Sequence, residues 1–255
     1  MEILTSAGLR EFPHGFTTRK GGVSAPPWHE ANLGGSVGDD PSHVGENWRR
    51  LEAVAGLGFA RVRQVHGARV VRADAPGPSP EEADAVVSLA PGLAACVSVA
   101  DCVPVLLADP RSGAVAAVHA GWRGTLARAA AEGVRALVRE AGADPRSLLA
   151  AIGPSIGPCC YEVSPELAAR FEAELGPVTV RPGAAPRLDL WAANAAVLVG
   201  AGLAPERIEA LRRCTSCEPE RFFSHRRDHG RTGRQVAYIA PRGAHLGAGG
   251  AGTLP

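Results

Sequence analysis

Three side chains that commonly bind metal ions follow segments with the apolar character of β-strands. They are His66 in QVHG, Cys102 in VADC and His119 in VHAGWRG. Strand ends often carry functional sites, and imidazole and thiolate ligands suit zinc or copper. Structural zinc sites usually pair closely spaced ligands and use four of them, whereas these three are dispersed. The pattern therefore favours an open, catalytic metal site over a structural one.

The same residues also have a purely structural interpretation. Cys102 has the size of a small buried hydrophobe, and the two histidines stand where turns are expected. Asp101, next to Cys102, would orient a ligand or act as an acid–base group, or it simply ends a strand. The residue types alone leave these interpretations open.

Motifs along nearly the whole chain occur in a characteristic order. They are TTRKGGVS (17–24), NLGGSVGDDP (32–41), QVHG (64–67), ADCVPVLLAD (100–109), AVHAGWRGT (117–125), AIGPSIGPCCYEV (151–163), CTSC (214–217) and FFSHRRDHGRTGRQ (222–235). Together they resemble the bacterial YfiH-type proteins, also called laccase-domain proteins, polyphenol oxidases or peptidoglycan-editing factors. The mammalian purine-nucleoside enzyme FAMIN is similar to the same group. The resemblance implies a single α+β domain with mixed β-sheets packed with helices, and a zinc ion held by His66, Cys102 and His119.

The resemblance also implies two reactions in one pocket. These are the phosphorolysis of inosine or adenosine, which yields the base and ribose 1-phosphate, and the deamination of adenosine. Phosphorolysis needs an anion site beside the ribose, and the planar fork of arginine matches two phosphate oxygens. Arg227 in SHRRD is the first candidate and Arg19 in TTRKGG the second, with Asn32 as a ligand for a ribose hydroxyl. An ion pair of Arg227 with Asp228, and an Asn32 that caps its own turn, are the structural alternatives.

The residue inventory favours zinc over copper. A blue-copper centre with two histidines and one cysteine normally adds an axial methionine, and Met1 is the only methionine. A multicopper laccase needs a further copper cluster held mainly by histidine, and the chain has 8 histidines in all. Copper with oxidation of phenols is therefore the alternative. Two others are an amidase that edits peptidoglycan precursors and a non-catalytic, metal-stabilised binding subunit.

Four further cysteines form two close pairs, Cys159–Cys160 and Cys214-x-x-Cys217. A single C-x-x-C does not close a four-ligand zinc site, and this one lies outside any thioredoxin-like βαβ context. Adjacent cysteines seldom form an unstrained disulfide. We expect Cys214 and Cys217 to be structural thiols.

Composition restricts the classes of protein that these residues could serve. The 255-residue chain has 27 basic and 26 acidic residues and a net charge of +1, without the basic excess of nucleic-acid or membrane-surface binders. It has no apolar stretch of about 18 residues that could span a bilayer. Its polar N-terminus does not resemble a signal peptide. We therefore expect a cytoplasmic protein that acts on small molecules, with neither nucleic acid nor membrane as partner.

The elements that must position the candidate residues follow from periodicity and capping residues. Apolar stripes after caps, among them Thr125, predict helices over 40–55, 125–138, 164–176 and 189–199. Apolar runs predict strands over 61–65, 69–73, 84–88, 94–99, 103–109, 114–119, 148–152 and 235–240. Several runs are apolar throughout, as expected for strands buried on both faces, and the early strands are close enough to pair antiparallel. Segment 75–82 is expected to be a surface loop, and residues from about 243 a flexible tail of one domain spanning 1–255.

Overall fold

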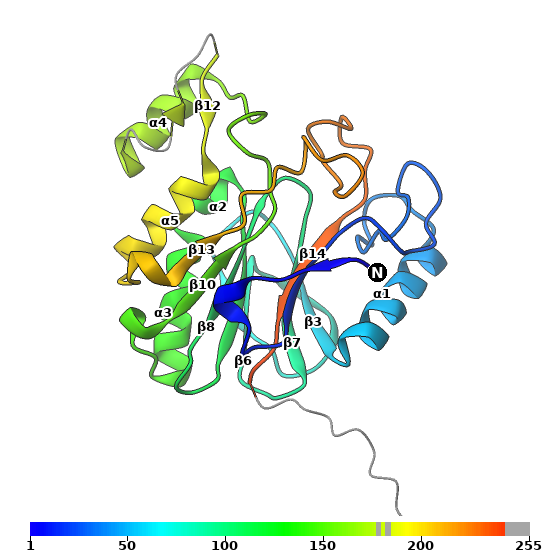
Figure 1. Cartoon of the computed structure of the whole chain (residues 1–255), viewed down its shortest axis with the longest axis horizontal. Helices are drawn as coiled ribbons and strands as arrows, with labels where there is room; N and C mark the ends of the chain where they lie inside the picture. Colours follow the sequence, from blue (N-terminus) through cyan, green and yellow to red (C-terminus); the bar gives the residue numbers. More distant parts are fainter. Residues whose placement is uncertain (177–179, 182–184, 243–255) are drawn as a thin grey trace, which may run out of the picture.

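Two mixed β-sheets packed face to face form the centre of the structure (Figure 1). The computed structural model describes residues 1–176, 180–181 and 185–242. The first sheet has the order β1 (Ile3–Leu4), β2 (His14–Thr17), β14 (Gln235–Ile239), β7 (Leu93–Val99), β3 (Gly58–Arg63), β5 (Gly77–Glu82). The second has the order β13 (Ile208–Ala210), β10 (Leu149–Ile152), β8 (Val103–Ala108), β9 (Val115–Ala120), β6 (Ala85–Ser88), β4 (Val70–Arg72). A separate pair consists of β11 (Val180–Arg181) and β12 (Arg187–Leu188).

Helices cover the outer faces of both sheets (Figure 1). The α-helices are α1 (Pro41–Ala55), α2 (Trp122–Leu126), α3 (Ala129–Ala141), α4 (Pro165–Leu175) and α5 (Leu190–Gly200). Short 3-10 helices occur at η1 (Ala7–Leu9), η2 (Pro145–Ser147) and η4 (Pro205–Arg207). Helix α1 packs on the first sheet, and α3 and α5 pack on the second. The layers therefore run helix, sheet, sheet, helix, which is the α+β architecture expected from the sequence.

Strand β8 explains why so many segments are apolar throughout. Val105 and Leu107 face the core shared with α3 and α5, whereas Leu106 and Ala108 face the core between the two sheets. Alternate side chains of a strand point to opposite faces, so a strand in the middle of these layers needs apolar residues at every position. Burying each of these larger side chains contributes about 1.5–3 kcal/mol.

The structure confirms three of the four predicted helix starts. The side chains of Asp40, Ser164 and Asp189 accept hydrogen bonds from backbone N–H groups in the first turns of α1, α4 and α5. Thr125 does not cap a helix, and this prediction was wrong. It lies inside α2, where its hydroxyl donates to the carbonyl of Gly121 at 3.0 Å, and the long helix starts only at α3. A threonine hydroxyl can cap the start of a helix, or it can donate to the carbonyl four residues earlier when the threonine lies inside a helix. Thr125 has the second role.

Two predictions about the early strands are also wrong. Segment 75–82 contains an edge strand, β5, which pairs in parallel with β3 across a register shift. Its prolines fit an edge position, because an edge strand leaves some N–H groups unpaired. The early strands pair in parallel, β3 with β7 and β4 with β6, because the chain alternates between the two sheets from β3 to β7 and so returns to each sheet in the same direction. The expected tail from about 243 lies outside the described residues.

The described residues contain no helix with the length and apolar character needed to cross a membrane.

Candidate metal centre

The structure brings His66, Cys102 and His119 together, and we call them the metal triad. Cys102 lies in the turn between β7 and β8, His119 near the end of β9, and His66 in the loop between β3 and β4. The β8–β9 register pairs Val103 with Ala120, so the Cys102 turn lies next to the end of β9. The ligand atoms of the triad lie within 4.8 Å of one another, and the two imidazole centroids are 4.9 Å apart. One ion could therefore contact all three side chains.

The backbone around the triad has a close approach at a glycine and two residues with positive φ angles. A Cβ atom on Gly121 would lie 2.8 Å from the Cys102 sulfur, so glycine is required there for close approach. His66 and Asp101 have φ angles of 62° and 84°, in the left-handed region that residues with a Cβ rarely adopt. Backbone strain of this kind concentrates at functional sites, where surrounding contacts maintain it.

The carboxylate of Asp84 holds two of the three ligands in place through hydrogen bonds. It is fully buried, and its Oδ1 lies 2.8 Å from Nδ1 of His119, which leaves Nε2 as the free ring nitrogen. The same carboxylate accepts the backbone N–H groups of Val65, His66 and Gly67 at 3.2, 2.9 and 2.6 Å. A single side chain thus fixes the orientation of His119 and the loop that carries His66. Burial raises the pKa of Asp84, but the hydrogen bonds from His119 and Gly67 outweigh this effect and lower it.

Electrostatics inside the triad favour a thiolate. Burial raises the pKa of Cys102, but the charge of His119 and hydrogen bonds with both histidines lower it to about 6. Burial lowers the pKa of His119, but the Cys102 charge and the bond to Asp84 raise it to about 9. A deprotonated sulfur is the form that binds metals, and a bound cation would displace the proton that His119 holds.

The triad opens onto a cavity of about 690 Å³, which we call the metal cavity. Its wall carries five arginines but, in the described part of the chain, only one carboxylate, that of Asp101. The arginines are Arg61, Arg63, Arg123, Arg226 and Arg234. Arg63 is ion-paired with Glu82, and the described residues place no carboxylate within ion-pair distance of the other four. The cavity is therefore strongly cationic and suited to an anionic ligand.

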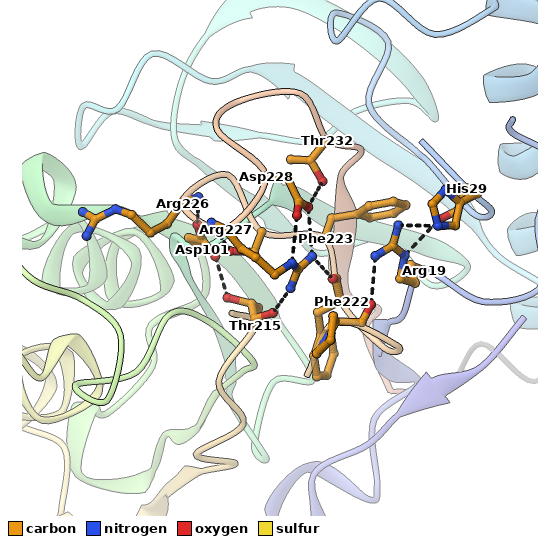
Figure 2. A network of polar contacts seen from close by, with 12 residues as sticks. Arg19, His29, Asp101, Thr215, Phe222, Phe223, Arg226, Arg227, Asp228 and Thr232 are labelled. Atoms are coloured by element: carbon orange, nitrogen blue, oxygen red, sulfur yellow. Dashed lines mark hydrogen bonds and ion pairs between the residues drawn. The ribbon is translucent and has the colours of Figure 1, made fainter. Parts of the chain in front are cut away.

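Asp101 is held on both carboxylate oxygens (Figure 2). Oδ1 accepts a 2.6 Å hydrogen bond from the hydroxyl of Thr215, and Oδ2 accepts one of the same length from the backbone N–H of Arg226. Its backbone carbonyl accepts the N–H of Ile156. Asp101 therefore ties the turn that carries Cys102 to three other segments, which favours a positioning role over an acid–base role.

Comparison with known proteins places this architecture in a family. Residues 13–242 match the family described as multi-copper polyphenol oxidoreductase laccase. The chain belongs to this family. It is 46% identical over 231 residues to a Deinococcus radiodurans protein named purine nucleoside phosphorylase, covering 89% of this chain and 88% of that one. A Streptomyces coelicolor protein of the same name is 45% identical over 231 residues, with 88% and 93% covered. The crystal structure of the hypothetical protein YfiH from Bacillus licheniformis superposes with a TM-score of 0.83 at 34% identity, over 89% of this chain and 92% of that chain.

In this laccase-family chain the donor set fits zinc better than a blue-copper centre. Met1, the only methionine, packs against the cluster that includes Leu33 and Trp48 and does not line the metal cavity. The axial thioether typical of blue copper is therefore missing from the triad. Two imidazoles, one thiolate and an open side toward a cavity match the pattern of catalytic zinc.

Arg226 and Arg227 point in opposite directions (Figure 2). Arg226 faces the metal cavity, donates to the carbonyl of Glu162 and lies over the ring of Tyr161. Arg227 forms a two-pronged ion pair with Asp228 at 2.8 and 2.9 Å and donates to the carbonyls of Thr215 and Phe222. Each nitrogen of the Arg227 guanidinium is therefore engaged within the protein, as in the structural alternative.

Arg19 and Arg227 line a second cavity of about 550 Å³, which does not include the metal triad. Arg19 donates to the carbonyls of His29 and Pro219 and stacks on Phe223 at 4.9 Å (Figure 2). The structure brings these two arginines to one cavity, but it does not bring them to the triad. Their contact with phosphate stays a prediction.

We expect Arg227→Lys to lower stability more than catalysis. Lysine keeps the charge but loses the fork that binds Asp228 and the two carbonyls, at a cost of about 1–3 kcal/mol in the free energy of unfolding. Chemical denaturation measures this loss, and Arg231→Lys, at an exposed residue of the same cavity, is the matched control. Unchanged stability with a raised KM for phosphate would instead assign Arg227 to the phosphate site.

Asn32 is fully engaged in local structure. Its Oδ1 accepts the N–H groups of Gly34 and Arg234, and its Nδ2 donates to Asp39 and to the carbonyl of Gly34. It is buried and does not line the metal cavity. This geometry corresponds to the turn-capping alternative, and a ribose contact stays a prediction.

Sequence reasoning missed Asp84 and Arg234. The only signal for Asp84 was a carboxylate at the start of an otherwise apolar strand, which in a buried position must find partners. Arg234 lies in the TGRQ segment, directly before β14 begins at Gln235. The segment alone does not reveal that the Arg234 side chain lines the cavity of the triad.

Proposed function

We propose that this chain is a zinc-dependent purine nucleoside phosphorylase, which converts inosine or adenosine and phosphate into the free base and ribose 1-phosphate. The observation that carries the proposal is the metal triad at the wall of a cavity that the described residues line with five arginines and one carboxylate. The names of the relatives from Deinococcus and Streptomyces support it. His66, Cys102 and His119 would hold the zinc, which when bound supplies Lewis-acid polarisation.

The residues of the chain would then provide the anion site for phosphate. In the reaction a phosphate oxygen forms a bond to C1′ of the ribose, the bond from C1′ to the purine nitrogen breaks, and the base takes its electron pair and a proton. The transition state carries positive charge on the ribose and negative charge on phosphate. Arginines that are fixed before the reaction stabilise this phosphate without reorganisation.

Arg234 is the arginine best placed for this role. Within the described residues its hydrogen bonds run from Nη1 to the carbonyls of Thr232 and Gly233, so Nε and Nη2 keep N–H groups for a ligand. Burial lowers the pKa of this guanidinium, and the negative charges of Cys102 and Asp101 partly oppose that effect. The guanidinium therefore interacts electrostatically with the Cys102 side of the triad. One edge of the fork is anchored and the other is available, as a two-pronged phosphate contact requires.

Arg61 gives the cavity a second such cation. Its guanidinium lies over the Trp48 ring at 4.1 Å, and among the described residues its buried Nε has no hydrogen-bond partner. Arg61 lines the cavity and adds positive charge to it, whereas the buried Nε without a partner is a cost to the fold.

We expect purified protein to release hypoxanthine from inosine only when phosphate is present, with ribose 1-phosphate as the second product. Arg234→Lys keeps the charge and loses the fork, so KM for phosphate should rise or kcat fall by about ten- to a hundredfold. Arg63→Lys is the matched control, because Arg63 is committed to Glu82. Coupled spectrophotometric assays across a phosphate series measure both effects. Hypoxanthine release without phosphate would indicate a hydrolase and contradict the proposal.

We extend the proposal to adenosine deamination in the same cavity. There water replaces the purine amino group, ammonia leaves, and no phosphate takes part. Arg234→Lys should therefore reduce deamination less than phosphorolysis. Ammonia and inosine formation from adenosine, measured without phosphate, checks this extension.

The competing functions predict different results. A copper-dependent polyphenol oxidase, the activity in the family description, would carry copper after purification and oxidise phenols. An amidase would release amino acids from peptidoglycan precursors, and a binding subunit would turn over none of these substrates. The expected result is zinc in protein purified without added metal, with nucleoside turnover that copper loading does not increase.

A further inference from the structure

Four cysteines outside the metal triad meet at one place, and we call them the four-cysteine cluster. They are Cys159, Cys160, Cys214 and Cys217. The pairs lie more than fifty residues apart in sequence, in the loop after β10 and in the turn after β13. Their four sulfur atoms lie within 4.8 Å of one another. The structure therefore completes the ligand set that the C-x-x-C alone could not provide.

The sulfur distances fit a shared ion better than a disulfide. Cys217 Sγ lies 3.4 Å from the sulfur of Cys159 and 3.3 Å from that of Cys160. A disulfide holds its sulfurs about 2.0 Å apart and would use one of these equivalent partners, leaving the other thiol unpaired. Zinc–sulfur bonds of about 2.3 Å in a tetrahedron place the sulfurs about 3.8 Å apart. All four cysteines are free thiols in the structure.

The surrounding backbone prepares the cluster for a cation. Cys214 is buried and forms a parallel bridge with Ser155, and its sulfur accepts the N–H of Gly157 at 3.3 Å. A backbone donor aimed at a sulfur stabilises its thiolate form. Cys159 and Cys217 are exposed, which leaves an entry path for the ion.

We propose that the four-cysteine cluster is a second, structural zinc site, separate from the metal triad. Four thiolates close the coordination shell, so the ion would take no part in chemistry. It would instead cross-link two loops that support the metal cavity. Ile156 from the first loop donates to the Asp101 carbonyl, and Thr215 from the second donates to the Asp101 carboxylate.

The test is the zinc content of chains purified under reducing conditions, by native mass spectrometry and elemental analysis. We expect two zinc ions per wild-type chain. Cys217→Ser, at an exposed cysteine, should retain one and melt at a lower temperature, His119→Ala should also retain one, and the double variant none. Cys96→Ala removes a thiol from the core beside α1 and should keep both ions. Because the readout is metal content, it does not depend on the proposed phosphorylase activity.

Cobalt substitution gives a second readout if Cys217→Ser fails to fold. Cobalt in His119→Ala should show the intense thiolate charge-transfer bands of a four-sulfur tetrahedral site, and these bands should be absent from the His119→Ala/Cys159→Ser double variant. One zinc per wild-type chain that His119→Ala abolishes would overturn the proposal. So would a chain that is lighter by two hydrogens and has two fewer titratable thiols, because that result shows a disulfide.

Discussion

Alanine at His66, Cys102 or His119 is expected to remove one metal ion per chain and to reduce nucleoside phosphorolysis by about a thousandfold. A Lewis acid supplies several kcal/mol of transition-state stabilisation, and about 4 kcal/mol corresponds to this factor. Elemental analysis and initial-rate assays of the three variants measure both quantities. Loss of any one ligand leaves two, which cannot hold the ion at the same affinity.

These variants should lose most of their phosphorolysis rate but little of their free energy of unfolding. The ligands lie at strand ends and in loops, whereas the core between the sheets is made of residues such as Phe16, Leu106 and Ile239 that the substitutions do not touch. His43→Ala, on the exposed part of α1, is the matched control and should retain metal and rate. Full metal occupancy in all three triad variants would refute the assignment of the ligands.

The triad followed from the sequence only through the family resemblance, because the residue types alone left a structural interpretation of Cys102 and the two histidines open. The hydrophobic pattern placed Cys102 and His119 near strand ends, but only the β8–β9 register, which pairs Val103 with Ala120, shows that these ends meet. The direction in which the strands pair could not be predicted from local sequence. Parallel pairing of β3 with β7 depends on which distant strand supplies the neighbour, and segment 61–99 alone does not specify it.

The residues that support the site were harder to predict because their roles depend on contacts between distant segments. Arg227 has the residue type for phosphate, yet the neighbouring Asp228 and two carbonyls occupy its guanidinium. Cys159–Cys160 and Cys214–Cys217 were each uninformative alone, and the parallel pairing of β10 with β13, continued by the bridge between Ser155 and Cys214, brings them together. A sequence shows which side chains are available, whereas the fold decides which of their atoms remain unpaired.

Asp84→Asn is expected to weaken metal binding at the triad by about ten- to a hundredfold, although Asp84 is not one of the three proposed ligands. The carboxylate accepts four hydrogen bonds, one from His119 and three from the loop of His66. Asparagine has a single acceptor oxygen, and its amide group would face an N–H group that it cannot bind. The His66 loop and the His119 ring would then lose their fixed orientation. Each unsatisfied buried donor also costs about 1–3 kcal/mol of stability.

Asp109→Asn separates the effect on the metal from the effect on stability. Asp109 is also buried and accepts the N–H groups of Arg111 and Ser112, but it lies in the turn that joins the other ends of β8 and β9. Both variants should lose stability in chemical denaturation, and only Asp84→Asn should lose zinc to a competing chelator at a lower concentration than wild type. Equal zinc affinity in the two variants would show that Asp84 supports the fold without orienting the ligands. A selective loss would show that the buried carboxylate sets the affinity of the triad through His119 and the loop of His66.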